Sequence, residues 1–243
     1  MARIFVTGSA DGLGRATAHT LHDEGHQVIL HARSRERLRA VTEMFRNGAS
    51  GVVGDLADLA QTEDVAHQVN ELGPVDAVIH NAGVYSGAAV LPVNTVAPYL
   101  LTALIHRPQR LVYLSSGMHA SGRADPIGQD WTGTRRAGSY ADSKLFVTTL
   151  AFAMARRWPG VVSHAVDPGW VPTRMGGPGA PDDLRLGHLT QEWLVTSDDA
   201  AVRESGGYWF HQQRRPTHPA AADEEFQDRL ITALATATGI SPP

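Results

Sequence analysis

The chain has 243 residues, of which 42% are hydrophobic and 19% are charged, and its formal net charge at pH 7 is -4. This length suits one sizeable α/β domain and is too short for two comfortable ones. Acidic and basic residues are interspersed, so the sequence offers none of the extended cationic surface that nucleic acids or anionic membranes require. The expected partners are therefore small molecules, with no role for nucleic acid or membrane.

The absence of cysteine excludes disulfides and thiolate metal sites. No apolar run approaches the roughly 20 residues that span a bilayer, and the first residues, MARIFVTGSADG, lack the features of a signal peptide. We therefore expect a soluble cytoplasmic protein. His19, His22 and His26 lie near one predicted helix, but no partner ligand is identifiable for them, and no metal is expected.

Short β-branched runs alternate with longer amphipathic runs, which is typical of parallel strands joined by crossover helices. The predicted strands are residues 3–8, 27–32, 51–55, 76–83, 110–116, 161–169 and 206–210. The predicted helices are residues 15–25, 34–48, 61–73, 95–106, 139–158 and 224–237, with an irregular stretch after residue 169. Most strands are apolar throughout, as expected when helices cover both faces of a sheet. The sequence thus predicts a single Rossmann-type α/β domain with a doubly wound, mostly parallel, seven-stranded sheet.

The first predicted strand runs into TGSADGLG, just ahead of the helix at 15–25. Glycines at this place let the chain turn tightly and let a pyrophosphate approach the backbone N–H groups of a helix amino terminus. The spacing is TGxxxGxG rather than GxGxxG, and such glycines could also do no more than form a strand-to-helix turn. The candidate cofactor contacts in this turn are Gly8, Ser9, Asp11, Gly12, Leu13 and Gly14.

Further motifs follow at the ends of later strands. They are NAG at 81–83, Asn94 in a helical segment, the pair Ser115 and Ser116, YADSK at 140–144, and DPG at 167–169. Together with the glycine turn, this ordered set resembles the single-domain branch of the short-chain dehydrogenase/reductase family over essentially the whole chain. The resemblance implies an enzyme that interconverts a carbonyl group and an alcohol by hydride transfer with a nicotinamide cofactor.

The end of the strand at 27–32 bears on the choice of cofactor. An acidic residue there binds the ribose 2′-hydroxyl of NAD(H), whereas an arginine accommodates the 2′-phosphate of NADP(H). Ala32 stands where the acid would be, and Arg33 follows it. NADP(H) is therefore the preferred cofactor, with Ser34 and Arg37 as further contacts and NAD(H) possible. Asp11 departs from the basic residue that NADP-dependent relatives often carry in the glycine turn.

The resemblance implies further cofactor contacts beyond this strand. Asp55 corresponds to the adenine-contacting aspartate of the family, although it could instead cap the following turn. The other positions that match the cofactor site are Leu56, Asn81, Ala82, Gly83, Tyr140, Lys144, Pro168, Gly169, Val171 and Thr173.

Tyr140 and Lys144 are four residues apart and therefore lie on one face of a helix. A free tyrosine has a pKa of about 10 and is a poor base at neutral pH. A nearby ammonium and a cationic nicotinamide ring are expected to lower the pKa of Tyr140. By resemblance, Tyr140 donates or accepts the proton, and Lys144 assists it and binds the nicotinamide ribose. Ser116 corresponds to the serine that holds the substrate oxygen, and Asn94 to the asparagine that holds a relay water, although Asn94 could also simply start a helix.

The segment between the serine pair and Tyr140 is longer than in many relatives. It resembles that of retinol-dehydrogenase-like and atypical oxidoreductase members, which also carry a histidine shortly after the serines. We expect this segment to border the substrate pocket, together with a Gly- and Pro-rich flap after Trp170. The candidate lining residues are Met118, His119, Trp131 and Trp170. Trp131 could instead only anchor its loop, and His119 is interpreted as a neutral residue rather than a catalyst.

The resemblance divides the chain into a cofactor half, residues 1–115, and a catalytic and substrate half, residues 116–243, with the flap at 170–195. In relatives, the helix corresponding to 95–106 and the helix that starts at Tyr140 form a common dimer interface. The first of these is short here, so a homo-oligomer and a monomer both stay open. A rival function is a non-catalytic NADP(H)-binding redox sensor or regulatory protein, which would have no need of the serine, tyrosine and lysine set.

Overall fold

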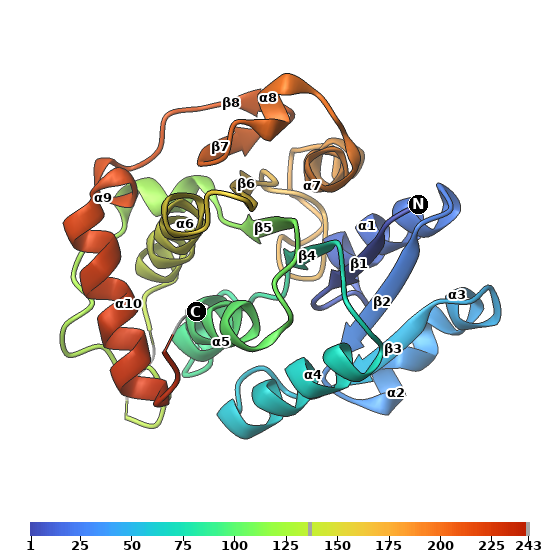
Figure 1. Ribbon diagram of the computed structural model, residues 1–243, viewed down its shortest axis with the longest axis horizontal. Helices are drawn as coiled ribbons and strands as arrows, with labels where there is room; N and C mark the ends of the chain where they lie inside the picture. Colours follow the sequence, from blue (N-terminus) through green and yellow to red (C-terminus); the bar gives the residue numbers. More distant parts are fainter. Residues whose placement is uncertain (136–137, 242–243) are drawn as a thin grey trace.

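The computed structural model describes residues 1–135 and 138–241, which form an eight-stranded sheet flanked by helices (Figure 1). The sheet order is β3-β2-β1-β4-β5-β6-β7-β8. The strands are β1 (Arg3–Val6), β2 (Gln27–Ala32), β3 (Ser50–Val53), β4 (Ala77–His80), β5 (Arg110–Leu114), β6 (Val162–Asp167), β7 (Gly207–Phe210) and β8 (Gln213–Arg214). All neighbours pair in parallel except β7 and β8. The predicted doubly wound, mostly parallel sheet is confirmed.

The sheet has one strand more than the seven predicted. β8 is only two residues long and pairs antiparallel with the end of β7. The two residues that connect these strands, His211 and Gln212, adopt left-handed backbone angles, with φ of 48° and 59°. Neither residue type is a strong signal for such a turn, so the sequence does not predict this hairpin.

Helices connect the strands on both sides of the sheet. The α-helices are α1 (Gly12–Asp23), α2 (Arg35–Leu38), α3 (Thr42–Arg46), α4 (Leu59–Glu71), α5 (Ala97–Leu104), α6 (Tyr140–Arg157), α7 (Leu184–Thr196), α8 (Ala200–Arg203), α9 (Pro219–Ala222) and α10 (Glu224–Thr238). The 3-10 turns η1 (Arg39–Val41) and η3 (Gly117–Ser121) and the π-helical turn η2 (Pro92–Val96) complete the set.

The single helix predicted at 34–48 is wrong, because α2, η1 and α3 divide that segment. Val41 has a φ of -122° and lies outside the helical region, so the chain bends there. The bend lets both Val41 and Met44 enter the core beneath this segment. Burial of these two side chains thus outweighs the continuous helix that the local sequence favours.

Two apolar clusters sandwich the sheet. The larger one joins α4, α5, α6 and α10 to one face of the sheet and includes Val65, Leu100 and Phe146. The other joins α1 and α7 to the opposite face and includes Leu21 and Leu194. Nearly every side chain of β1 and β4 is buried, as expected for central strands of a sheet that is covered on both faces.

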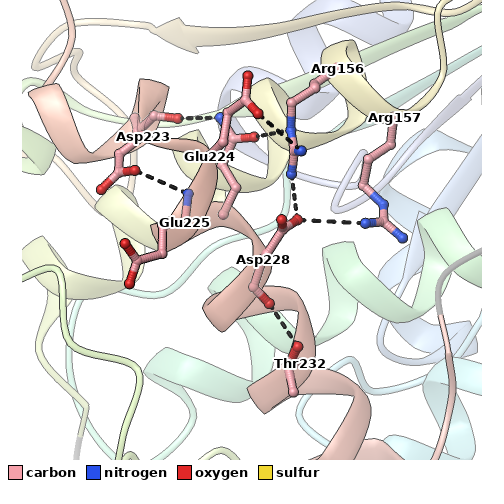
Figure 2. A network of polar contacts seen from close by, with 9 residues as sticks. Arg156, Arg157, Asp223, Glu224, Glu225, Asp228 and Thr232 are labelled. Carbon is pink, nitrogen blue, oxygen red and sulfur yellow. Dashed lines mark hydrogen bonds and ion pairs between the residues drawn. The ribbon is translucent and has the colours of Figure 1, made fainter.

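The last long helix, α10, packs against α6 (Figure 1). The Phe226 ring of α10 lies 6.3 Å from the Phe146 ring of α6. At the end of α6, Arg156 donates to Gln227 at 2.9 Å and also binds Asp228, in the polar network that Figure 2 shows. α10 therefore covers part of the surface of α6. No helix within the described residues combines the length and the apolar character needed to cross a membrane.

Candidate active site

The predicted site motifs follow the carboxyl ends of four adjacent strands. The glycine turn follows β1, Asn81 follows β4, the serine pair follows β5, and Asp167 ends β6. The strand order reverses direction between β1 and β4, and dinucleotides bind at such a switch point in open α/β sheets. The fold therefore gathers these motifs at one edge of the sheet, although they are spread over 160 residues of sequence.

The glycine turn is built for close approach of the backbone. Gly8 and Gly12 have φ of 65° and 53°, which favours glycine. A Cβ atom added to Gly14 would lie 2.5 Å from the Gly8 carbonyl oxygen and closer still to the Asn81 amide. That amide donates to the carbonyl of Thr7 at 2.8 Å and ties the end of β4 to β1. The tight turn at the start of α1, with Asn81 and Ala82 packed beside it, fits the pyrophosphate of a nicotinamide dinucleotide.

His31 supports this turn from β2 and was missed in the sequence. Its Nδ1 accepts from the backbone N–H of Gly8 at 3.0 Å, and its Nε2 donates to the carbonyl of Gly54 at 2.9 Å. Burial lowers the pKa of His31 to about 4, although the hydrogen bond to Gly54 and the charge of Asp55 oppose the change. The ring is therefore neutral at pH 7 and joins the glycine turn to β2 and to the end of β3.

Two of the predicted cofactor contacts already bind other protein groups. Ser9 is fully buried, and its hydroxyl accepts from the backbone N–H of His31 at 2.8 Å. Asp55 accepts from the backbone N–H of Ala57 at 3.0 Å, which is the turn-capping alternative. Neither contact uses every acceptor position of its side chain, but both show that these residues also stabilise the turns that carry them.

The predicted NADP(H) determinants lie at the start of α2. Arg33 is exposed, and Ser34 caps α2 by accepting from the backbone N–H of Arg37. Arg37 reaches back to Asp11, with 3.1 Å between the guanidinium and the carboxylate. Asp11 also caps α1 by accepting from Gly12 at 2.8 Å. The negative charge of Asp11 thus partly neutralises the positive charge of Arg37, one of the basic residues expected beside a 2′-phosphate.

Tyr140 and Lys144 occupy the first turn and a half of α6. Ser139 caps this helix by accepting from the backbone N–H of Asp142 at 3.2 Å, which explains why the helix begins at Tyr140. The Lys144 ammonium donates to the Leu114 carbonyl at 2.8 Å and lies 5.4 Å from the centroid of the Tyr140 ring. Burial lowers the pKa of Lys144 to about 8, while the charge of Asp167 opposes this change.

The pKa of Tyr140 moves in the opposite direction from the prediction. Burial raises it to about 12, and hydrogen bonding by Ser116 only partly opposes that change. The Lys144 ammonium is directed to the Leu114 carbonyl rather than to the phenol oxygen. The predicted lowering is therefore wrong for the chain alone, in which Tyr140 is a protonated phenol.

Ser116 lies at the start of η3, where its hydroxyl accepts from the backbone N–H of Met118 at 3.2 Å. His119 lies behind it: its Nδ1 donates to the Ser116 carbonyl at 2.8 Å, and its Nε2 accepts from the backbone N–H of His218 at 3.1 Å. The ring is buried and lies 4.4 Å from the Tyr208 ring. Burial lowers the pKa of His119. The two ring nitrogens thus join the η3 turn to the segment before α9, and the role of His119 as a pocket-lining residue stays a prediction.

Asn94 lies inside the π-helical turn η2 and is buried. Its Oδ1 accepts from the backbone N–H of Val84 at 2.8 Å, and its Nδ2 donates to the Val84 carbonyl at 2.9 Å and to the Ser143 hydroxyl at 3.0 Å. A Cβ atom on Gly83 would lie 3.4 Å from the Asn94 Oδ1 and 3.6 Å from the Lys144 ammonium. Asn94 therefore lies next to the lysine and does not act as a helix cap. Ser143, its partner on α6, was not singled out in the sequence.

Several of the large side chains expected near the substrate are exposed, and one further aromatic ring packs on Tyr140. The Tyr85 ring lies 4.9 Å from the Tyr140 ring and is 56% exposed. Met118 and Trp170, two of the predicted lining residues, are 42% and 60% exposed. Trp131 is instead buried with its ring 5.5 Å from the Phe146 ring, so its prediction as a lining residue is wrong and its anchoring role is the one observed. The long segment before Tyr140 uses this tryptophan to attach to the core.

The predicted flap is attached to the glycine turn. A Cβ atom on Gly12 would lie 3.5 Å from the Thr173 side chain. Val171 is buried, and a Cβ atom on Gly187 of α7 would lie 2.7 Å from it. The Trp170 indole donates to the Gly176 carbonyl at 2.8 Å. Residues 168–173 thus lie beside the glycine turn, and the contacts predicted for them with the cofactor stay a prediction. No three His, Cys, Asp or Glu residues within the described part of the chain form a metal-binding group.

The strand order and the glycine turn at the switch point are typical of dinucleotide-binding α/β proteins. A family model described as short chain dehydrogenase matches residues 2–105. An uncharacterized oxidoreductase of Emericella nidulans is 37% identical, covering 100% of this chain and 99% of its own. The short-chain dehydrogenase chyC of Penicillium rubens is 36% identical, covering 100% of both chains. This protein therefore belongs to the short-chain dehydrogenase family of oxidoreductases.

A third relative and two solved structures extend this comparison. DnrU of Streptomyces sp. strain C5, provisionally named a daunorubicin C-13 ketoreductase, is 31% identical over 97% of this chain and 92% of its own. A crystal structure from Mycobacterium Paratuberculosis matches with a TM-score of 0.82, 21% identity, and coverage of 100% and 95%. A blue fluorescent protein from a metagenomic library, solved with NADPH, matches with a TM-score of 0.71, 20% identity, and coverage of 86% and 95%. At these identities the two structures support the fold.

Proposed function

We propose that this protein is an NADP(H)-dependent oxidoreductase that interconverts a ketone or aldehyde and the corresponding alcohol. The observation that carries the proposal is the convergence of four residues from three separate segments of the chain: Ser116 before η3, Asn94 in η2, and Tyr140 and Lys144 in α6. Ketoreductase activity in the provisional name of one relative supports the reaction class, and a bound NADPH in one structural neighbour supports the cofactor.

In this proposal, residues 1–115 hold the cofactor, residues 116–243 supply proton transfer and substrate contacts, and residues 170–195 form the flap. The bound cofactor supplies or accepts the hydride. In the reductive direction, the Ser116 and Tyr140 hydroxyls bind the carbonyl oxygen of the substrate, on which negative charge develops. The raised pKa of Tyr140, about 12, means that the phenol carries the proton this oxygen needs.

Lys144 and Asn94 act behind the tyrosine. Lys144 places a positive charge 5.4 Å from the Tyr140 ring, which favours the phenolate that remains after the proton has moved. Asn94 fixes the backbone of Val84 and the Ser143 hydroxyl next to the lysine, and holds the relay water in this proposal. In the oxidative direction the same groups act in reverse, and Tyr140 accepts the proton of the alcohol.

Cofactor preference in this proposal depends on the start of α2. Arg33 is exposed at the end of β2, where an arginine can bind a 2′-phosphate through charge-assisted hydrogen bonds. No acidic side chain occupies position 32, where a carboxylate would repel that phosphate and select NAD(H). Asp11 binds Arg37 and so reduces, without cancelling, the positive potential there.

The test is a panel of ketones and aldehydes, incubated with the purified protein and either NADPH or NADH, and followed by the absorbance of the reduced nicotinamide. We expect carbonyl-dependent oxidation with at least one substrate class and a higher kcat/KM with NADPH. Tight NADPH binding without oxidation by any carbonyl or reduction of NADP⁺ by any alcohol would refute the enzyme proposal and favour the redox sensor.

A further inference from the structure

Asp167 ends β6, and the ammonium of Lys144, which extends from α6, lies at the same end of the sheet, at the last residue of β5. Leu114, the last residue of β5, pairs with Val166 of β6. The backbone N–H of Ser115 donates to the Val166 carbonyl at 2.7 Å. The Leu114 carbonyl accepts a hydrogen bond from the Lys144 ammonium. Asp167 follows Val166 directly, so the ammonium of Lys144 and the carboxylate of Asp167 lie at the ends of two hydrogen-bonded neighbouring strands.

The Asp167 carboxylate has a fixed orientation. Its Oδ1 accepts from the backbone N–H of Gly169 at 3.0 Å. Its Oδ2 lies 3.2 Å from the point where a Cβ atom on Gly117 would stand. Gly117 directly follows Ser116, and its lack of a side chain leaves room for this oxygen. The carboxylate therefore extends beneath the turn that presents the Ser116 hydroxyl.

The other titratable groups around Asp167 come from several elements. Tyr140 belongs to α6, His119 to η3, Tyr208 to β7, and Asp182 to the loop after Gly169. The pKa of both tyrosines is raised and that of His119 is lowered, each chiefly by burial, so all three are neutral at pH 7. Asp182 accepts from the backbone N–H of Trp170 at 2.6 Å. Within this group, Lys144 is the cation that a negative charge on Asp167 would stabilise.

We propose that Asp167 is a positioning residue whose carboxylate keeps Lys144 in its ammonium form and supports the turn that presents Ser116. Burial alone disfavours the ammonium, and the pKa of Lys144 falls to about 8 even with Asp167 present. Removing the carboxylate therefore moves the pKa of Lys144 further down, toward neutrality. The role in turnover rests on the proposed function, whereas the effect on the charge of Lys144 does not.

The sequence offers a direct measurement, because Lys144 is the only lysine among the 243 residues. Protein made with lysine labelled with ¹³C at Cε gives one side-chain lysine signal, and its chemical shift against pH reports the protonation of Lys144. The variants are Asp167→Asn, which keeps the shape and the acceptor for Gly169, and Asp182→Asn as the matched control. Asp182 accepts a backbone N–H from the same loop, but it is not among the charges that raise the Lys144 pKa.

We expect the Lys144 titration midpoint to move to lower pH in Asp167→Asn, to stay at the wild-type value in Asp182→Asn, and to return close to it in Asp167→Glu. An unchanged midpoint in folded Asp167→Asn would overturn the proposal. Should that variant fail to fold, Asp167→Ser provides the same comparison. Because the titration needs neither cofactor nor substrate, it is decided independently of whether the protein turns over a carbonyl.

A second readout is the pH profile of kcat/KM, once a substrate is known. In Asp167→Asn we expect the profile to move in the same direction as the Lys144 midpoint, and kcat to fall more than KM rises. A purely structural role of Asp167 would lower activity equally at every pH. Such a uniform loss, with an unchanged Lys144 midpoint, would contradict the proposal.

Discussion

The guanidinium of Arg37 lies 3.1 Å from the carboxylate of Asp11, so a basic residue at the start of α2 is paired with an acidic residue of the glycine turn. If a 2′-phosphate binds near Arg33, it competes with Asp11 for this guanidinium and is repelled by the carboxylate. We expect Asp11→Asn to tighten NADPH binding by roughly three- to tenfold and to change NADH binding less. Isothermal titration with both cofactors measures this. Equal effects on the two cofactors would place Asp11 away from the phosphate.

Arg33 gives the complementary prediction. Arg33→Asp removes a charge-assisted contact and adds a repulsive one, so we expect NADPH affinity to fall by about 10- to 100-fold while NADH affinity changes by less than about threefold. Arg35→Asp is the matched control, because Arg35 is exposed two residues further on, within α2. The prediction fails if Arg35→Asp weakens NADPH binding as much as Arg33→Asp does.

Gly14 tests the close packing of the turn. In Gly14→Ala the new methyl group would collide with the Gly8 carbonyl, 2.5 Å away, and with Asn81. We expect the free energy of unfolding to fall by about 1–3 kcal/mol, and cofactor affinity to fall as well, because Asn81 joins β4 to β1 beside this turn. Gly160→Ala, which has open space around it, should change stability by less than about 0.5 kcal/mol. Urea denaturation and fluorescence titration with NADPH measure the two effects.

Three of the buried histidines make the stability of the protein fall in acid. Burial lowers the pKa of His31 and His164 to about 4 and that of His80 to about 3. Below pH 6.5 the unfolded chain therefore binds more protons than the folded one, and the free energy of unfolding falls as the pH drops from 6.5 toward 4. Within that window each of these histidines lowers the free energy of unfolding by about 1 kcal/mol for every pH unit of acidification. Urea denaturation at pH 7.5, 6.0 and 5.0 measures the slope.

A matched pair of variants assigns this slope. His80→Phe keeps a ring between Tyr113 and the core but cannot be protonated, so it should flatten the pH dependence, whatever its effect at pH 7.5. His67→Gln replaces an exposed histidine of α4 and should leave the slope unchanged. A slope that is the same in wild type and His80→Phe would contradict the assignment to this residue.

The sheet and the four strand-end motifs could be predicted because each is a local signal. Apolar runs of four to six residues, the glycines after β1, and the YADSK segment at the start of α6 all lie within short windows of sequence. Their convergence follows from the parallel sheet, whose carboxyl ends meet at one edge. Ser116 and Tyr140, which are 24 residues apart, are brought together because α6 packs against η3 beside this edge.

The remaining features depend on contacts that no local pattern encodes. The sequence around His31 predicts an ordinary strand residue, yet its two ring nitrogens form hydrogen bonds with the backbone of Gly8 and of Gly54. Trp131 lies in a polar segment but is buried against Phe146. His119 has the spacing of a pocket residue, but His218, 99 positions away, binds it. The raised pKa of Tyr140 depends on how deeply the packing of the fold buries the phenol, and the spacing of tyrosine and lysine does not reveal it.

The most direct test of the proposed chemistry is the pair Tyr140→Phe and Tyr85→Phe, with NADPH affinity and turnover measured on the same preparations. The two rings lie 4.9 Å apart, and each substitution removes one hydroxyl while keeping the ring. If Tyr140 supplies the proton, Tyr140→Phe binds NADPH with wild-type affinity but loses about 10²- to 10⁴-fold in kcat, whereas Tyr85→Phe stays close to wild type. Full turnover in Tyr140→Phe would contradict the mechanism.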